Sequence, residues 1–243
     1  MSFLSKLRLP HDRQAAAAPA SRGDKPGGGT GQLTRPGPAY SPRDGRLSNG
    51  LKEFLWHLDD VGHGGLLDMG PVWQATVTFF IERNFKVYTE DLLTAWRDFL
   101  QAEQERLRSL VPGDDLSEMT PTARAERFLN SSLQYPNETF DGVLAWDLLD
   151  YLEDSVAGRV VARLTDLVKK GGVILAIFHS RQPGGFHRYR VLDTQNLELI
   201  PAPVLVPHQR VYQNREIQNL FSRFHSSKTF VGRDQIREGL FVR

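Results

Sequence analysis

The spacing of hydrophobic and polar positions across residues 65–91 predicts a β-α-β unit. A short apolar run just before Asp68 is typical of a buried parallel strand. Apolar positions then recur at helical spacing over 72–80, and a second strand-like run follows at 85–88. The two predicted strands lead into acids, Asp68 in the first case and Glu90-Asp91 in the second. Ligands of open parallel sheets bind beyond the carboxyl ends of the strands, so these acids mark the expected site.

The same reading predicts further helices and strands along the rest of the chain. Helices are expected over 49–58, 92–110, 121–127, 155–168 and 214–224. Strands are expected over 127–133, 142–145, 173–178, 188–192, 197–200, 227–231 and 239–242. The two runs at 188–192 and 197–200 alternate as an inserted antiparallel hairpin would. The loop at 181–185 follows a predicted buried strand, where a substrate would enter.

Four blocks, in this order, resemble the class I S-adenosylmethionine-dependent methyltransferases. Asp68-Met69-Gly70 matches the start of the Asp/Glu-x-Gly-x-Gly-x-Gly motif after the first strand of that family. The other three blocks are 127–133, 140–152 and the Gly171-Gly172 junction before an apolar strand. The resemblance covers roughly residues 50–243. It implies a three-layer, Rossmann-like α/β fold with a mainly parallel seven-stranded sheet and an antiparallel strand near the C-terminus.

The resemblance also implies methyl transfer from S-adenosylmethionine to a small molecule. In that family the acids, glycines and small polar residues at these positions hold the amino-acid end, the ribose and the adenine of the cofactor. The cofactor-binding candidates are Asp68, Gly70, Pro71, Glu90, Asp91, Asn130, Ser131 and Trp146. The candidates for a general base are Asp147 and Tyr151.

These candidates have structural alternatives. Asp147 is also suited to the N-cap of a following helical turn. Trp146 and Tyr151 are equally explained by packing, and Asn130 and Ser131 by turn formation.

One departure from the family motif favours a second interpretation. Val72 and Gln74 replace two glycines that bring the backbone close to the cofactor, and Trp73 crowds the same loop. A catalytically inactive methyltransferase fold, kept as a binding or scaffold module, is therefore the alternative hypothesis. A Trp73 that points outward would favour the enzyme, whereas Trp73 or Gln74 in the groove would favour the scaffold.

Composition predicts a division into a basic tail, residues 1–47, and a domain, residues 48–243. Residues 1–46 hold eight lysines and arginines against three aspartates and are rich in proline, glycine and alanine. Such a segment is expected to be disordered. Contact of the tail with an anionic membrane or nucleic acid is the alternative to a solvated extension.

Several site and partner classes are excluded or disfavoured by what the sequence lacks. The chain has no cysteine, so it holds no disulfide or thiolate site. The seven histidines show no recognised metal-ligand spacing, and no metal is expected. Nucleic acid is a disfavoured partner, because the basic charge lies in the tail and not on the domain. No apolar run is long enough to span a membrane, and a cytoplasmic location is the default expectation.

Overall fold

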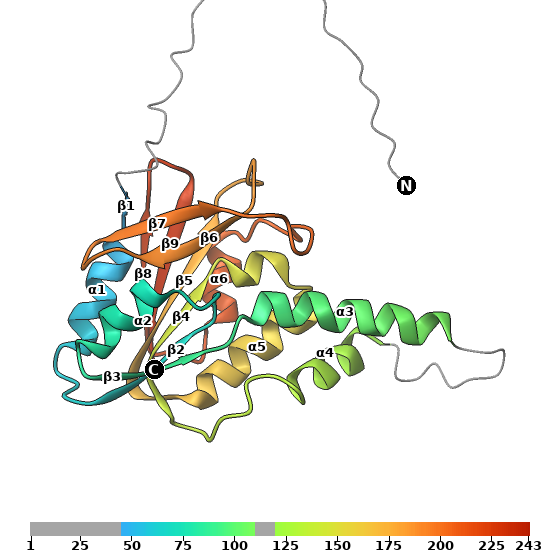
Figure 1. Ribbon diagram of the computed structural model, residues 1–243, viewed down its shortest axis with the longest axis horizontal. Coiled ribbons are helices and arrows are strands. Elements are labelled where there is room, and N and C mark those ends of the chain that lie inside the picture. Colours follow the sequence, from blue (N-terminus) through green and yellow to red (C-terminus); the bar gives the residue numbers. More distant parts are fainter. Residues whose placement is uncertain (1–44, 110–119) are drawn as a thin grey trace, which may run out of the picture. The chain divides into compact units, whose positions relative to one another are not determined.

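The central feature is a six-stranded mixed sheet in the computed structural model, which describes residues 45–109 and 120–243 (Figure 1). Its strand order is β3-β2-β4-β5-β9-β8. The strands are β2 (Gly64–Asp68), β3 (Phe85–Thr89), β4 (Phe140–Trp146), β5 (Val168–His179), β8 (Ser226–Val231) and β9 (Ile236–Val242). Strands β3, β2, β4 and β5 are parallel, and β9 runs antiparallel to β5 and β8. The predicted α/β fold with a mainly parallel sheet is confirmed.

Helices cover both faces of this sheet and make three layers. They are α1 (Asn49–Leu58), α2 (Gln74–Ile81), α3 (Leu92–Arg108), α4 (Pro121–Leu129), α5 (Asp154–Leu167) and α6 (Asn214–Leu220), with a 3₁₀ turn, η2 (Leu148–Tyr151). Neighbouring residues of β5 alternate between two cores: Ile174 packs with the side chains of α3 to α6, and Leu175 packs with those of α1 and α2. This alternation explains why β5 is apolar throughout its inner part.

Local capping explains where the helices begin. The Oγ of Ser48 accepts a hydrogen bond from the backbone N–H of Leu51 at 2.9 Å and starts α1. Asp91 caps α3 in the same way, accepting from the N–H of Thr94 at 3.1 Å. Thr120 caps α4, which has a proline in its first turn. The predicted helices over 49–58, 92–110, 121–127, 155–168 and 214–224 are each present, with ends that differ by a few residues.

The strand predicted over 127–133 is wrong. Residues up to Leu129 belong to α4, because Ala125 and Phe128 lie three positions apart on one buried helical face. Asn130 follows as the residue that ends the helix. The main sheet of the described residues therefore has six strands where the resemblance implied seven.

A second, three-stranded sheet lies across the carboxyl ends of the main strands (Figure 1). Its strands are β1 (Arg46–Leu47), β6 (His187–Val191) and β7 (Asn196–Pro201), in the order β1-β7-β6. The predicted hairpin is confirmed as β6–β7. Arg46 is buried and forms ion pairs with Asp234 and Glu238, so this strand is fixed to the main domain.

The described residues begin at Gly45, and most of the predicted tail lies outside them. Arg46 and Leu47, which the predicted tail included, form β1. Within the described residues, no helix combines the length and the apolar character that a membrane crossing needs.

Candidate functional site

Asp68 lies buried at the carboxyl end of β2, where the sequence predicts a ligand site. Its Oδ1 accepts hydrogen bonds from the backbone N–H of Gly70 at 3.0 Å and from Nε1 of Trp146 at 2.7 Å. Its Oδ2 is buried and has no hydrogen-bond partner among the described residues. Burial raises the pKa of Asp68 to about 6, although both hydrogen bonds oppose the rise.

Trp146 covers the loop that follows β2. It ends β4 with φ of 49°, a left-handed backbone conformation that is uncommon for a bulky residue. The indole lies over Gly70, where an added Cβ would come within 2.8 Å of Nε1. On its other side it stacks on the ring of Tyr189, with 5.6 Å between ring centroids and 6° between planes. Strained residues of this kind cluster at functional sites, and here the strain places an aromatic ring where the resemblance implies a cofactor.

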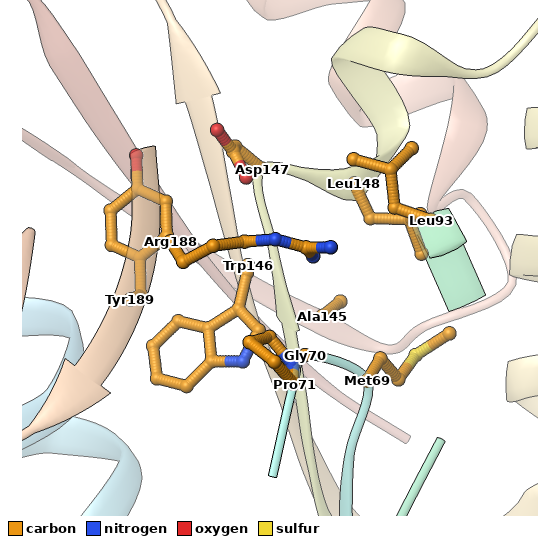
Figure 2. A pocket seen from close by; sticks show the side chains of 10 residues that line it. All are labelled: Met69, Gly70, Pro71, Leu93, Ala145, Trp146, Asp147, Leu148, Arg188 and Tyr189. Atoms are coloured by element: carbon orange, nitrogen blue, oxygen red, sulfur yellow. The ribbon is translucent and has the colours of Figure 1, made fainter. Parts of the chain in front are cut away.

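Asp91, at the amino end of α3, is held by Arg188 of β6. The Nη1 and Nη2 atoms of Arg188 lie 3.0 and 2.9 Å from the two carboxylate oxygens. Figure 2 shows the Arg188 side chain extending in front of Trp146 and toward Leu148. Glu90, the neighbouring candidate, accepts a hydrogen bond from the N–H of Leu133 at 2.8 Å and so fixes the turn after α4.

The cavity between Gly70, Trp146 and Arg188 is very small. Its volume is about 10 Å³, and its lining residues are Met69, Gly70, Pro71, Leu93, Ala145, Trp146, Asp147, Leu148, Arg188 and Tyr189 (Figure 2). Cofactor sites generally need about 300 Å³ or more. This space is therefore too small for S-adenosylmethionine, and binding of that molecule here would require Trp146 and Arg188 to move.

The side chains that close the site differ from those singled out in the sequence. Val72 and Gln74 are exposed, and neither they nor Trp73 line the cavity. Trp73 is half-buried, with its ring centroid 5.7 Å from the guanidinium carbon of Arg190. Trp73 and Gln74 therefore do not lie in the small cavity, where their presence would favour the scaffold hypothesis.

A larger cavity of about 340 Å³ lies on the other side of Tyr189, which borders both spaces. It is formed by the hairpin, the 181–185 segment and the connection between β8 and β9. Its lining residues are Arg46, His179, Arg181, Gln182, Pro183, Gly184, Gly185, His187, Tyr189, Leu199, Pro201, Asp234, Gln235 and Ile236. This volume is in the range of small-molecule sites.

Four titratable side chains meet beside these cavities, at the ends of β4 and β5. The Nδ1 of His179 lies 2.9 Å from Oδ2 of Asp150, which also accepts from the His179 backbone N–H at 2.7 Å. The Nε2 of His208 lies 3.9 Å from the same oxygen. The Oδ2 of Asp147 lies 4.0 Å from Nε2 of His179 and has no hydrogen-bond partner among the described residues.

Burial sets the protonation of this group. It raises the pKa of Asp147 to about 7, and the neighbouring His179 only partly offsets that rise. Burial opposes protonation of His179, but the hydrogen bond and the charges of Asp150 and Asp147 outweigh it and raise the His179 pKa. Burial lowers the pKa of His208. Two buried carboxyl groups with raised pKa values therefore face one imidazole whose pKa is also raised.

The structure brings together some of the predicted site residues and separates others. Gly70, Pro71, Trp146 and Asp147 line the small cavity. Asp68 is joined to it through its hydrogen bonds with Gly70 and Trp146, and Asp91 through Arg188. Six candidates line neither cavity: Asp68, Glu90, Asp91, Asn130, Ser131 and Tyr151. Asn130 and Ser131 are exposed at the end of α4, and Tyr151 is buried against Phe186 and two histidine rings.

Sequence reasoning missed His179 and Arg188 as site residues. His179 is the last residue of the long apolar strand β5, and a polar residue at such a strand end is the signal that identifies it. No local signal identifies Arg188, because its partner Asp91 lies 97 residues away in the sequence.

Comparison with known proteins finds similarity at the level of solved structures. No protein-family profile and no curated protein sequence matches the chain. A 1,6-didemethyltoxoflavin-N1-methyltransferase from Burkholderia thailandensis, solved with S-adenosylhomocysteine, is 17% identical over 80% of this chain and 76% of its own, with a TM-score of 0.42. An S-adenosylmethionine-dependent methyltransferase from Mesorhizobium loti is 14% identical over 79% of this chain and 96% of its own, with a TM-score of 0.43.

A putative type 11 methyltransferase from Sulfolobus solfataricus is similar to a comparable degree. It is 16% identical over 82% of this chain and 94% of its own, with a TM-score of 0.41. The fold itself is defined by this chain's own strand order, β3-β2-β4-β5-β9-β8, and by helices on both faces of the sheet.

Proposed function

We propose that the protein is an S-adenosylmethionine-dependent methyltransferase that acts on a small molecule and has a closed donor site in the described conformation. The observation that carries this proposal is the placement of Asp68 and Asp91 after two adjacent parallel strands, β2 and β3. Ligands of open α/β sheets bind at this edge. Asp68 also keeps a buried oxygen without a partner, which is suited to a donor group of a ligand.

The chemical types of the side chains fit the parts of the proposed cofactor. Asp68 and the backbone at Gly70 would hold its amino-acid end. Asp91 would accept hydrogen bonds from the ribose hydroxyls once Arg188 has withdrawn. Asn130 or Ser131 would contact the adenine, which is supported by their exposure next to the turn that Glu90 fixes.

The cofactor would supply an electrophilic methyl group, and the protein would contribute orientation. Holding two reactants in line supplies much of the acceleration of a displacement reaction. The cavity of about 340 Å³ is the proposed acceptor site, because its size suits a small molecule and Tyr189 joins it to the donor side. Asp147 is the proposed base for an acceptor that must lose a proton, because its unpartnered carboxylate borders the small cavity and Tyr151 borders neither.

Calorimetric titration with S-adenosylmethionine and S-adenosylhomocysteine tests the proposal. We expect micromolar binding by the wild-type protein and at least tenfold weaker binding by Asp91→Asn. Asparagine still caps a helix, so this variant keeps the cap of α3 while it removes the charge and the ion pair with Arg188. Asp193→Asn, in the exposed turn of the hairpin, is the matched control and should bind as the wild type does. Absence of binding by folded wild-type protein at millimolar cofactor would refute the proposal.

A non-catalytic binding or scaffold module is the second candidate. The observation that favours it is the closure of the donor site: Arg188 occupies both oxygens of Asp91 and only about 10 Å³ remains. If the protein is such a module, it will bind neither S-adenosylmethionine nor S-adenosylhomocysteine, even when Arg188 is replaced.

A further inference from the structure

The cluster at the ends of β4 and β5 has the composition of a metal site. Asp150, His179 and His208 each offer one ligand atom, and these atoms all lie within 4.8 Å of one another. We propose that these three side chains bind a divalent transition-metal ion. This site is independent of the proposed methyl transfer and is built from residues whose spacing in the sequence gives no metal signature.

The distances from Asp150 to the two histidine nitrogens suit a single ion. Metal–nitrogen and metal–oxygen bonds in proteins are about 2.0–2.2 Å, so two ligands of one ion lie up to about 4 Å apart. The Oδ2 of Asp150 lies 2.9 Å from Nδ1 of His179 and 3.9 Å from Nε2 of His208. Only small rotations of the side chains would be needed to surround an ion.

Unpartnered buried atoms point to a missing ligand. Asp150 is fully buried, yet its Oδ1 has no hydrogen-bond partner, and the same is true of Nε2 of His208. A buried polar atom without a partner costs free energy, so its presence in two members of one cluster calls for an explanation. An ion pair between Asp150 and His179 leaves both atoms unsatisfied. A bound cation would take Nε2 of His208 as a ligand, would satisfy Oδ1 as well when both oxygens of Asp150 coordinate it, and would offset the charge of the buried carboxylates.

The surroundings of His179 support the same conclusion. When Nδ1 of a histidine binds a metal, its Nε2 carries the proton and usually donates it to a carboxylate. The Nε2 of His179 lies 4.0 Å from the unpartnered Oδ2 of Asp147. Asp147 thus lies on the Nε2 side of the imidazole, opposite the nitrogen that would bind the ion. His179 also lines the cavity of about 340 Å³, which gives an ion a path into the site.

The donor set indicates which ions the site would select. Two imidazoles and one carboxylate suit zinc, cobalt, nickel or ferrous iron, whereas magnesium and calcium prefer sites made of oxygen ligands. Three protein ligands leave at least one coordination position for water or for a ligand from the cavity.

Titration of tag-free, chelator-stripped protein with Co²⁺ and Zn²⁺ tests this proposal. We expect one ion per chain, a visible Co²⁺ spectrum with nitrogen and oxygen ligands, and a higher Tm with Zn²⁺. His208→Ala should weaken Zn²⁺ binding at least tenfold while circular dichroism stays that of the wild type, because residue 208 lies outside any helix or strand. His225→Ala, an exposed histidine elsewhere, is the matched control and should bind as the wild type does.

Asp150→Asn provides a second variant that keeps the shape of the side chain. We expect it to lose Co²⁺ binding together with the visible spectrum. Stoichiometric binding that survives in folded His208→Ala protein, or that is lost in His225→Ala, would place the ion elsewhere and overturn the proposal. Absence of any one-to-one binding by the folded wild type would overturn it as well.

Discussion

Arg188, on strand β6 of the hairpin, donates hydrogen bonds from Nη1 and Nη2 to the two carboxylate oxygens of Asp91, at 3.0 and 2.9 Å. Asp91 at the same time caps α3. Asp91, the proposed partner of the ribose hydroxyls, therefore already has partners within the protein: the guanidinium of Arg188 and the backbone N–H of Thr94. Whether the site binds a cofactor depends on how readily Arg188 gives up this carboxylate.

Replacing Arg188 with glutamine should tighten binding of S-adenosylmethionine about tenfold. Charge-assisted hydrogen bonds are worth about 1.5–3 kcal/mol, and the ligand would no longer compete with them for Asp91. Calorimetry with the wild type and Arg188→Gln measures the difference. Arg190→Gln is the matched control, because Arg190 lies on the same strand but pairs with Glu198. Weaker binding by Arg188→Gln would mean that Arg188 holds the ligand instead of excluding it.

Asp68 should make the protein less stable as pH rises from about 4 to 6. Its pKa is raised from 3.8 to about 6 by burial, and Asp91 adds to the rise. The folded state therefore binds the proton more tightly than the unfolded state, and stability is lost as pH passes through the folded pKa. A shift of this size corresponds to about 3 kcal/mol.

Urea unfolding of the wild type and Asp68→Asn at several pH values measures this effect. Asparagine keeps an oxygen for the N–H groups of Gly70 and Trp146 and does not ionise. The stability of the wild type relative to Asp68→Asn should fall by about 3 kcal/mol between pH 4 and 7. A constant difference over this range would show that Asp68 titrates alike in both states.

Gly70→Ala should destabilise the protein by about 1–3 kcal/mol. The added Cβ would come within 2.8 Å of Nε1 and 2.9 Å of Cδ1 of Trp146, and moving the indole away costs its stacking on Tyr189 and its hydrogen bond to Asp68. Gly158→Ala is the matched control: nothing lies within 4 Å of its added Cβ, and it sits inside α5. Alanine should stabilise that helix by about 0.5–1 kcal/mol. Thermal unfolding of both variants should thus give shifts of opposite sign.

Removing residues 1–47 should cost about 3 kcal/mol more stability than removing residues 1–44. The three additional residues include Arg46, which is buried between Asp234 and Glu238, and breaking a buried ion pair leaves a carboxylate without its cation. Urea unfolding of the two truncated chains measures the difference. Arg46→Met in the longer one should reproduce most of it. Equal stabilities would support the boundary predicted from composition, at Ser48.

Several elements that the sequence predicts correctly have a clear period. The apolar positions of α3 and α5 recur at helical spacing, and the β6–β7 hairpin alternates. The segment 127–133 was wrongly predicted to be a strand, because a short apolar run beside polar residues occurs at the ends of both strands and helices. The chain forms a helix here because Ala125 and Phe128 lie on one buried helical face and Thr120 caps the first turn.

The site was predictable only where local sequence places residues at strand ends. Asp68, Trp146 and Asp147 follow from strand positions. In the structure Trp146 and Asp147 line one cavity, and Asp68 accepts a hydrogen bond from Trp146. The partners that decide its state come from distant segments: Arg188 reaches Asp91, and His179 reaches Asp150 across 29 residues. Such contacts depend on how the hairpin and β5 pack, which no local pattern encodes.

The stacking of Trp146 on Tyr189 also means that tryptophan fluorescence can report on the proposed donor site. The indole is 4% exposed, donates to a carboxylate and has an aromatic ring at 5.6 Å. Trp56 is already in water at 65% exposure, and Trp96 is fixed in the core of the opposite layer at 1%. A molecule that displaces Trp146 will therefore shift tryptophan emission to longer wavelength, and opening of this protein can be followed by fluorescence without any label.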